Sequence, residues 1–340
     1  MPRTFIEQFT RPGQMVEDVY QVIRKDLRTT KKGTFFISAR LRDRTGELPA
    51  IMWDASEALF GAIPQDGFAL VKGRVGEFND ALQIVIEAMR PAKPAEVHHE
   101  DFLPVGPNDP EKDFAKLRKV LDQVKRPALR ALLDAMWEDA DLVERLKRAP
   151  AAEKYHHAYL GGLLEHTLSV AETALVIADR YPKLDRDLLV LGALWHDLGK
   201  TRELSYDVAL GYTDGGILVG HLVQGVSMFD EKLRAVRAKG IEFSEPLADV
   251  VRHLIVAHHG TQEFGSPKPP MTAEAFVLHH IDNMDAKIHA FFRDVAADAD
   301  EDRRWTGFNK MFGGRLFKGI DEPADETAED DGKLPLKGGL

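Results

Sequence analysis

Residues 187–200 read DLLVLGALWHDLGK, an apolar run interrupted near its end by the adjacent pair His196 and Asp197. Its apolar residues recur three and four positions apart, which is typical of a helix that packs into a core. Burying such a polar pair costs free energy unless each side chain has a strong partner. Metal coordination would supply that partner, so the stretch predicts a buried helix that carries metal ligands.

Other histidines and aspartates extend this pattern along the middle of the chain. Eleven of the 13 histidines fall between His156 and His289, and the other two are His98 and His99. The candidate ligands, in chain order, are His166, His196, Asp197, His221, His258, His259 and Asp282. They suffice for two metal ions that share one bridging carboxylate, so they predict a metal-dependent phosphohydrolase. The alternative, ordinary hydrogen-bonded histidines, would have to hold independently at every position.

Composition limits the class of protein. With 340 residues, of which 44% are hydrophobic, the chain is long enough for two domains and a tail. The absence of cysteine excludes disulfides, thiolate zinc sites and cysteine nucleophiles, so any metal must bind nitrogen and oxygen. No run approaches about 18 to 20 apolar residues, and MPRTFIEQFTRPGQ lacks the apolar core of a secretory signal. We therefore expect a cytoplasmic protein with no membrane partner.

The formal net charge of −10 is unevenly distributed. Seven acidic residues and no basic one lie between Asp321 and Asp331, so this short stretch carries most of the excess. The first 50 residues lean the other way, and their basic cluster comprises Arg24, Lys25, Arg28, Lys31, Lys32, Arg40, Arg42 and Arg44. A basic face for nucleic acid is therefore compatible with the acidic total, although ordinary solvated charges are the alternative.

The first part of the chain has the pattern of a small β-barrel. Short apolar runs with β-branched and aromatic members alternate with Gly and Asp turns, namely GTFFISARLRD (33–43), GELPAIMWD (46–54), GFALVKGRVGEF (67–78) and ALQIVIEAMRP (81–91). The interval ASEALFGAI (55–63) reads as a short helix. Strands interrupted once by a short helix match the five-stranded OB-fold, so we predict a nucleic-acid-binding domain of that fold at residues 1–93.

Beyond residue 93 the pattern changes. Residues 94–112 contain four prolines and little periodicity, which predicts a linker. Residues 113–318 hold successive runs with apolar residues three and four apart, among them GGLLEHTLSVAETALVIADRY (161–181), and predict an all-α domain. The acidic stretch 319–340 is expected to be disordered. The chain is thus predicted to be multidomain, with a small all-β OB-fold barrel followed by a helical domain.

Several of these stretches resemble a known enzyme family. His166, the pair His196 and Asp197 within HDLGK, and the distal Asp282 resemble the HD superfamily of metal-dependent phosphohydrolases. The further ligands His221, His258 and His259 look like those of its two-metal subgroup. More specifically, an OB-like segment followed by HHAYLGGLLEHT, WHDLGK, GHLVQG, AHHG and HHIDNMDAK resembles the YhaM-type 3′→5′ exoribonucleases over roughly residues 4–318.

The resemblance implies how two metals divide the ligands. One ion would lie among His166, His196, Asp197 and Asp282. Asp197 would bridge it to a second ion, whose other ligands would be His221, His258 and His259. Asp285 can share a helix face with Asp282 and is the rival carboxylate, while His253, His279 and His280 are expected to pack or to support the ligands. Manganese is the ion implied, and Fe²⁺, Mg²⁺ and Co²⁺ are also compatible with such ligands.

Asp197 and Lys200 are the residues predicted to act in catalysis. Two metals roughly 3.5 to 4 Å apart lower the pKa of a shared water and neutralise phosphate charge, so no protein nucleophile is needed. Lys200 is placed to bind a phosphate oxygen, and the alternative is a favourable cation at a helix C-terminus. Four residues shortly before the first ligand helix are candidates for substrate contact, with a buried structural role as the alternative: Lys154, His156, His157 and Tyr159.

An exonuclease must also hold a strand, and OB-folds do so by stacking bases on aromatic rings while basic side chains follow the phosphates. The stacking candidates are Phe35, Phe36, Trp53 and Phe78. Because strand residues alternate, Phe35 and Phe36 face opposite sides, and one belongs to the core if the other is exposed. For Trp53 a core position is the favoured alternative. Arg40, Arg42 and Arg44 share one face and form the predicted electrostatic track, with simple solvation as the alternative.

We therefore expect an enzyme that removes nucleotides from the 3′ end of single-stranded RNA, with single-stranded DNA as a further candidate, and releases nucleoside 5′-monophosphates. The direction and the product follow from the resemblance alone. One alternative is a phosphodiesterase or phosphohydrolase that acts on a small nucleotide. Another is a non-catalytic nucleic-acid-binding module, which would require a missing ligand. The oligomeric state is open, although members of the superfamily often form homo-oligomers.

Overall fold

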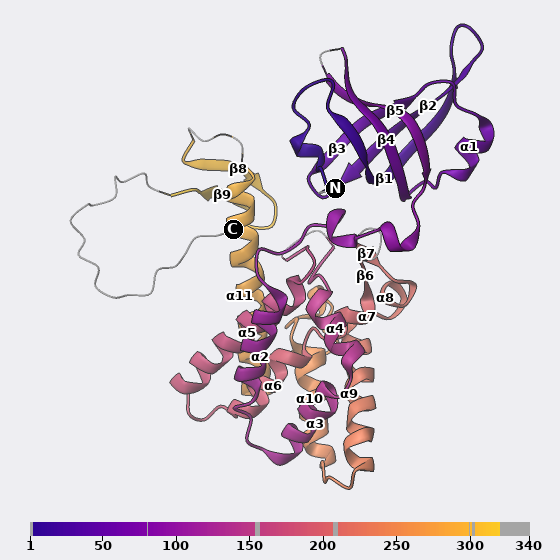
Figure 1. Ribbon diagram of the computed structural model, residues 1–340. Coiled ribbons are helices and arrows are strands. Elements are labelled where there is room, and N and C mark those ends of the chain that lie inside the picture. Colours follow the sequence, from indigo (N-terminus) through magenta and orange to yellow (C-terminus); the bar gives the residue numbers. More distant parts are fainter. Residues whose placement is uncertain are drawn as a thin grey trace. The chain divides into compact units, whose positions relative to one another are not determined.

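The computed structural model describes residues 3–79, 81–153, 157–206, 210–298, 300 and 303–319. Within this part the chain divides into two compact units (Figure 1). The first runs to Val105 and takes in the segment Ser205–Gly211, and the second takes in Gly106–Leu204 and the described chain from Tyr212 onward. Lys154, His156 and the predicted tail from residue 320 lie outside the described residues.

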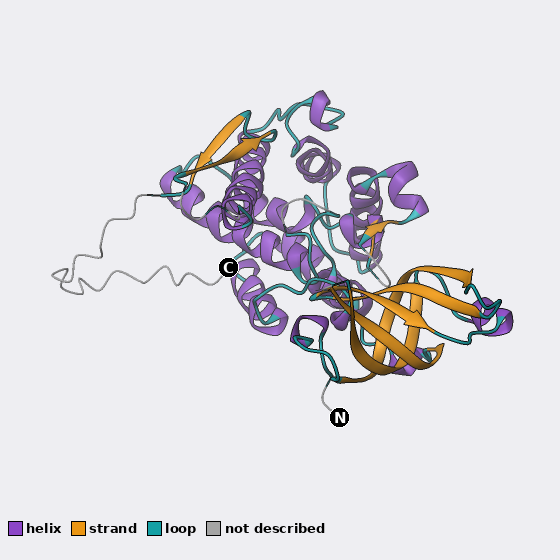
Figure 2. Ribbon diagram, turned by 90° about the horizontal axis from the view of Figure 1, so that it is seen from above, coloured by secondary structure: helices purple, strands orange, loops and turns teal. Residues whose placement is uncertain are grey.

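The first unit is a closed barrel of strands, drawn in orange in Figure 2. Its five strands follow the order β1-β2-β3-β5-β4. Its strands are β1 (Met15–Thr29), β2 (Phe35–Asp43), β3 (Gly46–Met52), β4 (Gly67–Phe78) and β5 (Ala81–Pro91). Neighbouring strands are antiparallel except β3 and β5, which are parallel. The predicted short helix is α1 (Glu57–Ala62), between β3 and β4. Ser56 caps α1 by accepting a hydrogen bond from the amide of Leu59.

Alternation along the strands builds the barrel core. In β2, for example, Ile37, Ala39 and Leu41 are buried. β1 is absent from the predicted apolar runs because apolar and charged residues mix along its 15 positions. A register shift between Val22 and Arg24 also interrupts its pairing with β2, which breaks the two-residue period.

The second unit is mainly helical. Its helices are α2 (Pro110–Leu121), α3 (Pro127–Trp137), α4 (Ala140–Arg148), α5 (Gly162–Arg180), α6 (Arg186–Trp195), α7 (Lys200–Glu203), α8 (Asp214–Val219), α9 (His221–Ala238), α10 (Glu245–Ala257) and α11 (Ala273–Ala296). A barrel followed by a helical domain confirms the predicted fold class. None of the described helices is both long and apolar enough to cross a membrane.

The chain also forms elements that the sequence patterns did not predict. One two-stranded sheet pairs β6 (Leu204–Ser205) with β7 (Gly211–Tyr212), and another pairs β8 (Trp305–Asn309) with β9 (Gly314–Phe317). Short 3-10 helices lie at Ile6–Gln8, Pro94–Glu96, His99–Asp101 and Gln262–Phe264. These segments are too short for periodicity to reveal them.

Helix α6 is the central element of the helical unit. Every residue from Leu188 to Trp195 is buried, and α6 packs against α5, α10 and α11. Asp185 caps its first turn by accepting a hydrogen bond from the amide of Leu188. Because the helix is covered on all sides, its sequence is continuously apolar. His196 and Asp197 come directly after this well-packed helix, which fixes their position.

Candidate metal centre

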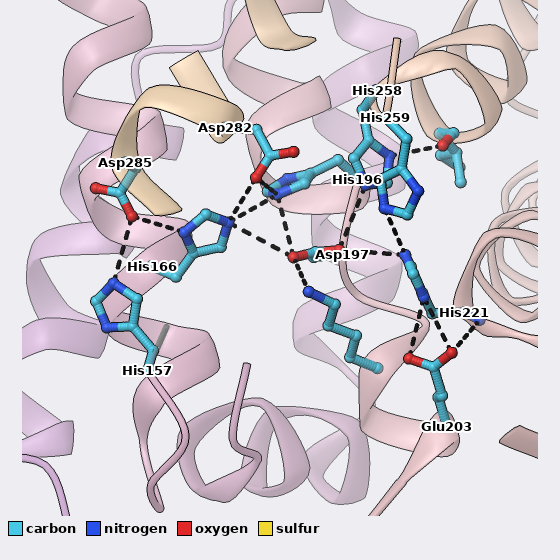
Figure 3. Close-up of polar contacts among 12 residues, drawn as sticks. His157, His166, His196, Asp197, Glu203, His221, His258, His259, Asp282 and Asp285 are labelled. Carbon is cyan, nitrogen blue, oxygen red and sulfur yellow. Dashed lines mark hydrogen bonds and ion pairs between the residues drawn. The ribbon is translucent and has the colours of Figure 1, made fainter. Parts of the chain in front are cut away.

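Four side chains from three segments of the helical unit form the first ligand group (Figure 3). They are His166 in α5, His196 and Asp197 just after α6, and Asp282 in α11. The Nε2 atom of His166 lies 3.1 Å from His196 Nε2, 3.3 Å from Asp282 Oδ1 and 3.5 Å from Asp197 Oδ2. Two nitrogens and two carboxylate oxygens thus converge, a donor set that suits a divalent cation.

Asp197 also belongs to a second ligand group, with His221 at the start of α9 and with His258 and His259 just after α10. Asp197 Oδ1 lies 3.5 Å from His258 Nε2 and 3.6 Å from His221 Nε2. The Nε2 atoms of His221 and His259 are 3.2 Å apart. One oxygen of Asp197 therefore faces each group, which is the placement expected of a bridging carboxylate.

The five histidines of the two groups share one ring orientation. In each, Nδ1 is hydrogen-bonded to an oxygen outside the cluster at 2.7 to 3.1 Å. In the order His166, His196, His221, His258 and His259, the acceptors are Asp285 Oδ2, Ala193 O, Glu203 Oε1, Ile255 O and Phe264 O. A neutral ring that donates from Nδ1 carries its lone pair on Nε2. The rings are therefore set to coordinate through the atoms that converge.

Buried polar atoms indicate that a cation fits within the second group. Asp197 Oδ1 and His258 Nε2 make no hydrogen bond to the described residues, although they face each other at 3.5 Å. The two residues are 1% and 0% exposed, so water has little access to these atoms. Leaving such atoms unpaired costs free energy. A metal ion bound to both would remove that cost.

Two glycines allow the ligand segments to approach one another. A Cβ atom on Gly199 would lie 2.0 Å from the carbonyl oxygen of His221, so only glycine lets the turn after α6 pack against the start of α9. A Cβ atom on Gly260 would lie 2.3 Å from the ring of His279. Gly260 also has a φ of +83°, which turns the chain directly after His259. The glycines of HDLGK and AHHG thus help to assemble the cluster.

Asp282 and Asp285, the two rival aspartates, lie on different sides of His166. Asp282 approaches the ring at Nε2, inside the cluster, whereas Asp285 Oδ2 is 2.7 Å from Nδ1, behind the ring. Ser169 also donates a hydrogen bond to Asp285. The geometry therefore favours Asp282 as the ligand and gives Asp285 the task of orienting His166.

Glu203 holds His221 in the same way, and the sequence reasoning missed it. Its Oε1 atom accepts hydrogen bonds from the amide of His221 at 3.0 Å and from Nδ1 at 3.1 Å. The residue lies six positions after Asp197, at the end of α7. Its proximity to HDLGK was a signal in the sequence, but nothing in that spacing distinguishes it from an ordinary surface glutamate.

The carboxyl groups of the cluster stay ionised. Burial by itself would raise the pKa of Asp197, but the charge of Lys200 and the interactions with His196 and His258 outweigh burial and hold that pKa well below its usual range. Burial likewise opposes ionisation of Asp282, yet its hydrogen bond to His166 lowers its pKa. Both carboxylates are therefore charged at neutral pH and available to a cation.

His166 in the first group differs in protonation from His258 and His259 in the second. Burial disfavours a charge on His166, but hydrogen bonds to Asp282 and Asp285 outweigh burial and raise its pKa to about 10. Burial lowers the pKa of His258 to about 3 and also lowers that of His259. In the metal-free protein at neutral pH, His166 therefore holds a proton, whereas His258 and His259 are neutral.

The cluster opens into a pocket of about 390 Å³. The pocket is lined by Asp197, Lys200, His259, Phe264, His279, Asp282, Asn283, Ala286, Lys287 and Met311. Lys200 Nζ donates a hydrogen bond to Asp197 Oδ2 at 2.7 Å. Lys200 is the first residue of α7, five positions beyond the end of α6. Its position at the pocket fits the alternative in which it contacts a phosphate.

His157 lies behind His166 and does not line the pocket. It is 3% exposed, its Nε2 atom is 3.3 Å from Asp285 Oδ2, and its ring stacks on His289 at a centroid distance of 3.9 Å. The predicted substrate contact is therefore corrected to a buried structural role, because the ring is enclosed by protein. Tyr159 is half-buried beside it and donates a hydrogen bond to Glu165 Oε2 at 2.9 Å.

The three remaining histidines near the cluster support or pack against other segments. His279 donates from Nδ1 to the carbonyl oxygen of His258 at 2.7 Å. His253 accepts a hydrogen bond from the amide of Met271 at 2.9 Å. The ring of His280 contacts that of Phe276. Of the three, His279 alone is bonded to a ligand residue among the described contacts.

The aromatic candidates on the barrel lie outside its core. Trp53 is 51% exposed, so the alternative of a core position is wrong, and its ring centroid is 5.2 Å from that of Phe36. Phe36 is half-buried and Phe35 is exposed, so neither ring belongs to the buried core. Phe78 is exposed as well. These rings are accessible in the barrel unit taken by itself.

Two arginines of the predicted basic track form ion pairs with one glutamate, Glu47. Arg40 and Arg42 both approach Glu47, at 3.5 and 2.8 Å. Arg44 lies beyond the end of β2 and donates to the carbonyl oxygen of Glu100. Glu47 therefore neutralises part of the charge on this face, although both β2 arginines remain accessible to solvent.

Comparisons with known proteins match these features. The HD domain family matches residues 163–287, which include all seven candidate ligands, and a family described as a putative helicase matches residues 122–182. By structure, one chain of a replication protein A heterotrimer bound to single-stranded DNA overlaps 27% of this chain and 70% of its own length. Its identity is 20% and its TM-score 0.20, which is too low to support an inference.

Curated relatives match over most of their length. The 3′-5′ exoribonuclease YhaM of Bacillus subtilis is 34% identical over 285 residues, which is 83% of this chain and 88% of that protein. The protein of the same name in Bacillus licheniformis is 36% identical over 290 residues, with the same two coverages. That of a Geobacillus species is 34% identical over 283 residues, 83% of this chain and 85% of that protein. The chain therefore belongs to the YhaM family of 3′-5′ exoribonucleases.

Proposed function

We propose that this protein is a metal-dependent 3′-5′ exoribonuclease that hydrolyses the phosphodiester bonds of single-stranded RNA and releases nucleoside 5′-monophosphates. The observation that carries the proposal is the convergence of two ligand groups on the shared carboxylate of Asp197, in a chain of the YhaM family. Single-stranded DNA is a further substrate in this proposal.

The proposed cofactors are two divalent metal ions, with Mn²⁺ preferred and Fe²⁺, Mg²⁺ and Co²⁺ as alternatives. The residues that would hold them are His166, His196, Asp197 and Asp282 for one ion, and Asp197, His221, His258 and His259 for the other. Bound ions would supply the Lewis acidity that activates water and offsets phosphate charge. The mixture of imidazole nitrogen and carboxylate oxygen supports ions of intermediate softness such as Mn²⁺.

The chain itself contributes orientation and charge. Asp285 and Glu203 accept hydrogen bonds from Nδ1 of His166 and His221, which fixes the ring tautomers. Asp197 keeps Lys200 beside the pocket through their 2.7 Å hydrogen bond. From there the ammonium group of Lys200 would bind a non-bridging phosphate oxygen and stabilise the charge that develops on it.

The proposal assigns strand binding to the barrel. Phe35 and Trp53 would stack on bases, and Arg40 and Arg42 would follow phosphates. The exposure of these side chains supports the assignment. Lys154, His156 and Tyr159 are kept as candidates for substrate contact.

The domain limits also remain proposals. We assign residues 1–93 to the nucleic-acid-binding domain, 94–112 to a linker, 113–318 to the catalytic domain and 319–340 to an acidic tail. The proposal places the enzyme in the cytoplasm, as a homo-oligomer. Light scattering of the purified full-length protein, with the mass compared with 38.0 kDa for one chain, tests the assembly.

The test of function is digestion of 5′-labelled single-stranded RNA by metal-stripped protein, with each candidate ion added back and products resolved at single-nucleotide length. We expect a metal-dependent ladder that shortens from the 3′ end, fastest with Mn²⁺. Asp197→Asn should abolish the ladder. Asp141→Asn is the matched control, because this aspartate is exposed on α4, remote in sequence from every ligand, and pairs only with Arg145 among the described residues.

Two other results would replace the proposal. Intact RNA, together with turnover of a cyclic dinucleotide or a nucleoside triphosphate by the same preparation, would make the protein a small-nucleotide hydrolase. RNA binding without turnover of any of these substrates under every added metal would make it a binding module.

A further inference from the structure

The hairpin of β8 and β9 combines basic and aromatic residues beside the metal centre. Residues 303–319 read RRWTGFNKMFGGRLFKG, with five basic residues and no acidic one, in a chain whose formal net charge is −10. We propose that this hairpin is a second binding site for single-stranded RNA, which stacks nucleobases on Trp305 and Phe308 and holds phosphates with Arg304, Lys310 and Arg315. The inference rests on the proposed exoribonuclease function and adds a site outside the barrel.

The hairpin is anchored to α11, the helix that carries Asp282. Asn309 Nδ2 donates a hydrogen bond to Asp294 Oδ2 at 2.7 Å, and the ring of Phe312 meets that of Phe291 edge-on at 5.5 Å. On its inner face Leu316 is buried. Figure 1 shows the two strands beside the C-terminal part of α11. The hairpin is therefore a fixed platform within the helical unit.

The outer face of the hairpin presents a row of rings. Trp305 pairs with Phe317 across the strands, and Phe308 pairs with Arg315. Arg315 and Phe317 are two residues apart on β9 and share a face, so their partners lie on that face as well. The register shift between Trp305 and Phe308 is what brings both rings to one side.

These rings are open to solvent in the helical unit. Trp305 is 51% exposed, Phe308 70% and Phe317 37%, and the centroids of Trp305 and Phe317 are 5.1 Å apart. Folding does not require such exposure, because the inner face already provides the packing. Exposed aromatic rings between basic side chains are the arrangement on which single-stranded nucleic acid stacks.

Three of the five cations of the hairpin are available to a ligand. Arg303 pairs with Asp300, and Lys318 pairs with Asp298. Within the described part of the chain, no ion pair or side-chain hydrogen bond engages the other three, which are Arg304, Lys310 and Arg315. An anionic polymer complements this face better than an uncharged or basic protein surface would.

The hairpin is continuous with the metal pocket. Met311, in its turn, lines that pocket together with Asp197, Lys200 and Asp282. A strand whose 3′ end lies at the metal centre would therefore pass the hairpin within its last few nucleotides. This continuity favours an RNA strand over a protein partner as the occupant.

The experiment measures the affinity of full-length, metal-stripped protein for labelled single-stranded RNA by fluorescence anisotropy at several salt concentrations. Removing metal prevents hydrolysis during the titration. For Trp305→Ala combined with Phe308→Ala we expect about tenfold weaker binding, because each stacked base contributes to affinity. For Arg304→Gln combined with Lys310→Gln we expect the slope of log K against log salt to fall by about 0.7 for each phosphate that the variant no longer neutralises.

Matched controls separate the hairpin from general surface effects. Tyr181→Ala removes an exposed aromatic ring at the end of α5, and Lys119→Gln removes a cation on α2. Both should bind RNA as the wild type does. The charge variant keeps the inference testable if loss of the rings unfolds the hairpin, and light scattering reports whether any variant changes assembly.

The outcomes distinguish this inference from the proposed function. If the wild type neither binds nor digests RNA, the proposed function fails and the hairpin site fails with it. If the wild type does both but the hairpin variants bind like the wild type, the hairpin site alone is wrong. A hairpin variant that alters the oligomeric mass without altering RNA affinity would also overturn it, since the face would then contact protein.

Discussion

The two ligand groups share Asp197 but differ in charge. The first combines it with a second aspartate, Asp282, and has Asp285 behind His166. The second combines Asp197 with three histidines and has Glu203 as the carboxylate behind it. A divalent cation gains more Coulomb energy beside two carboxylates than beside one. The comparison therefore predicts that the first group binds its ion more tightly.

The number of carboxylates in each group also determines how strongly protons compete with a metal ion for the histidines. The carboxylates around His166 raise its pKa to about 10, so a proton occupies the first group when metal is absent. Burial without a second carboxylate leaves His258 neutral, with a pKa of about 3. The comparison thus predicts a tighter position, at which the metal must replace a proton on His166, and a weaker position, at which His258 and His259 are already neutral.

Asp197→Asn has the largest expected effect, because it removes the ligand common to both groups. We expect the hydrolysis rate to fall by more than about a thousandfold and both ions to be lost, while RNA binding by the metal-free protein is unchanged. Initial rates on labelled RNA and metal analysis of the purified variant measure this. Hydrolysis near the wild-type rate would show that Asp197 is not the bridge.

His166→Ala and His259→Ala separate the groups. Each should slow hydrolysis by about a hundredfold or more, since the proposed mechanism uses both ions. His259→Ala should retain about one ion per chain after gel filtration, whereas His166→Ala should retain less, because the tighter position is damaged. Mass spectrometry measures the metal content of each variant. Equal contents in the two variants would show that the first group does not bind its ion more tightly than the second.

Asp285→Asn and Glu203→Gln test the carboxylates behind the ligands. Each removes an acceptor that orients a coordinating ring, and such changes cost about 10- to 100-fold in metal affinity. We expect Asp285→Asn to weaken the tight ion and Glu203→Gln the weaker one, as measured by titration against a chelator of known affinity. If either variant lowered the affinity for both ions equally, the two groups would not bind their ions independently.

The smallest expected effect is a difference in proton release. At a pH of about 8, below the pKa of about 10 for His166, the first ion must displace its proton, so the affinity of that ion should rise with pH up to about that value. The second ion meets His258 and His259 already neutral, since their pKa values are lowered. Calorimetric titration in two buffers of different ionisation enthalpy should show about one more proton released by the first ion. Equal release would mean that His166 is not protonated.

The sequence predicted the components of the centre but not their arrangement. All seven candidate ligands meet in one cluster. Each lies within or directly beside an apolar helical run, and buried polar groups need partners. Asp282 and Asp285 illustrate the limit. They lie three residues apart on one helix face, and only the position of α5 determines which nitrogen of His166 each one meets.

In the barrel, the sequence patterns missed β1 and misplaced Trp53 for local reasons. β1 was missed because a register shift and charged residues disturb its alternation. The ring of Trp53 was expected in the core, yet it lies on the outside of the barrel against Phe36. Periodicity identifies the face of a strand only while the strand continues, and β3 ends at Met52, one residue before Trp53.

The spread of the candidate ligands over several helices affects the stability of the fold as well as its chemistry. The ligands come from α5, the turn after α6, the start of α9, the end of α10 and α11, so bound ions would act as crosslinks in a chain that has no cysteine to form any. An ion present at about 100 times its dissociation constant stabilises a fold by about 2.7 kcal/mol. Cells starved of metal would thus hold an enzyme that is easier to unfold and to degrade.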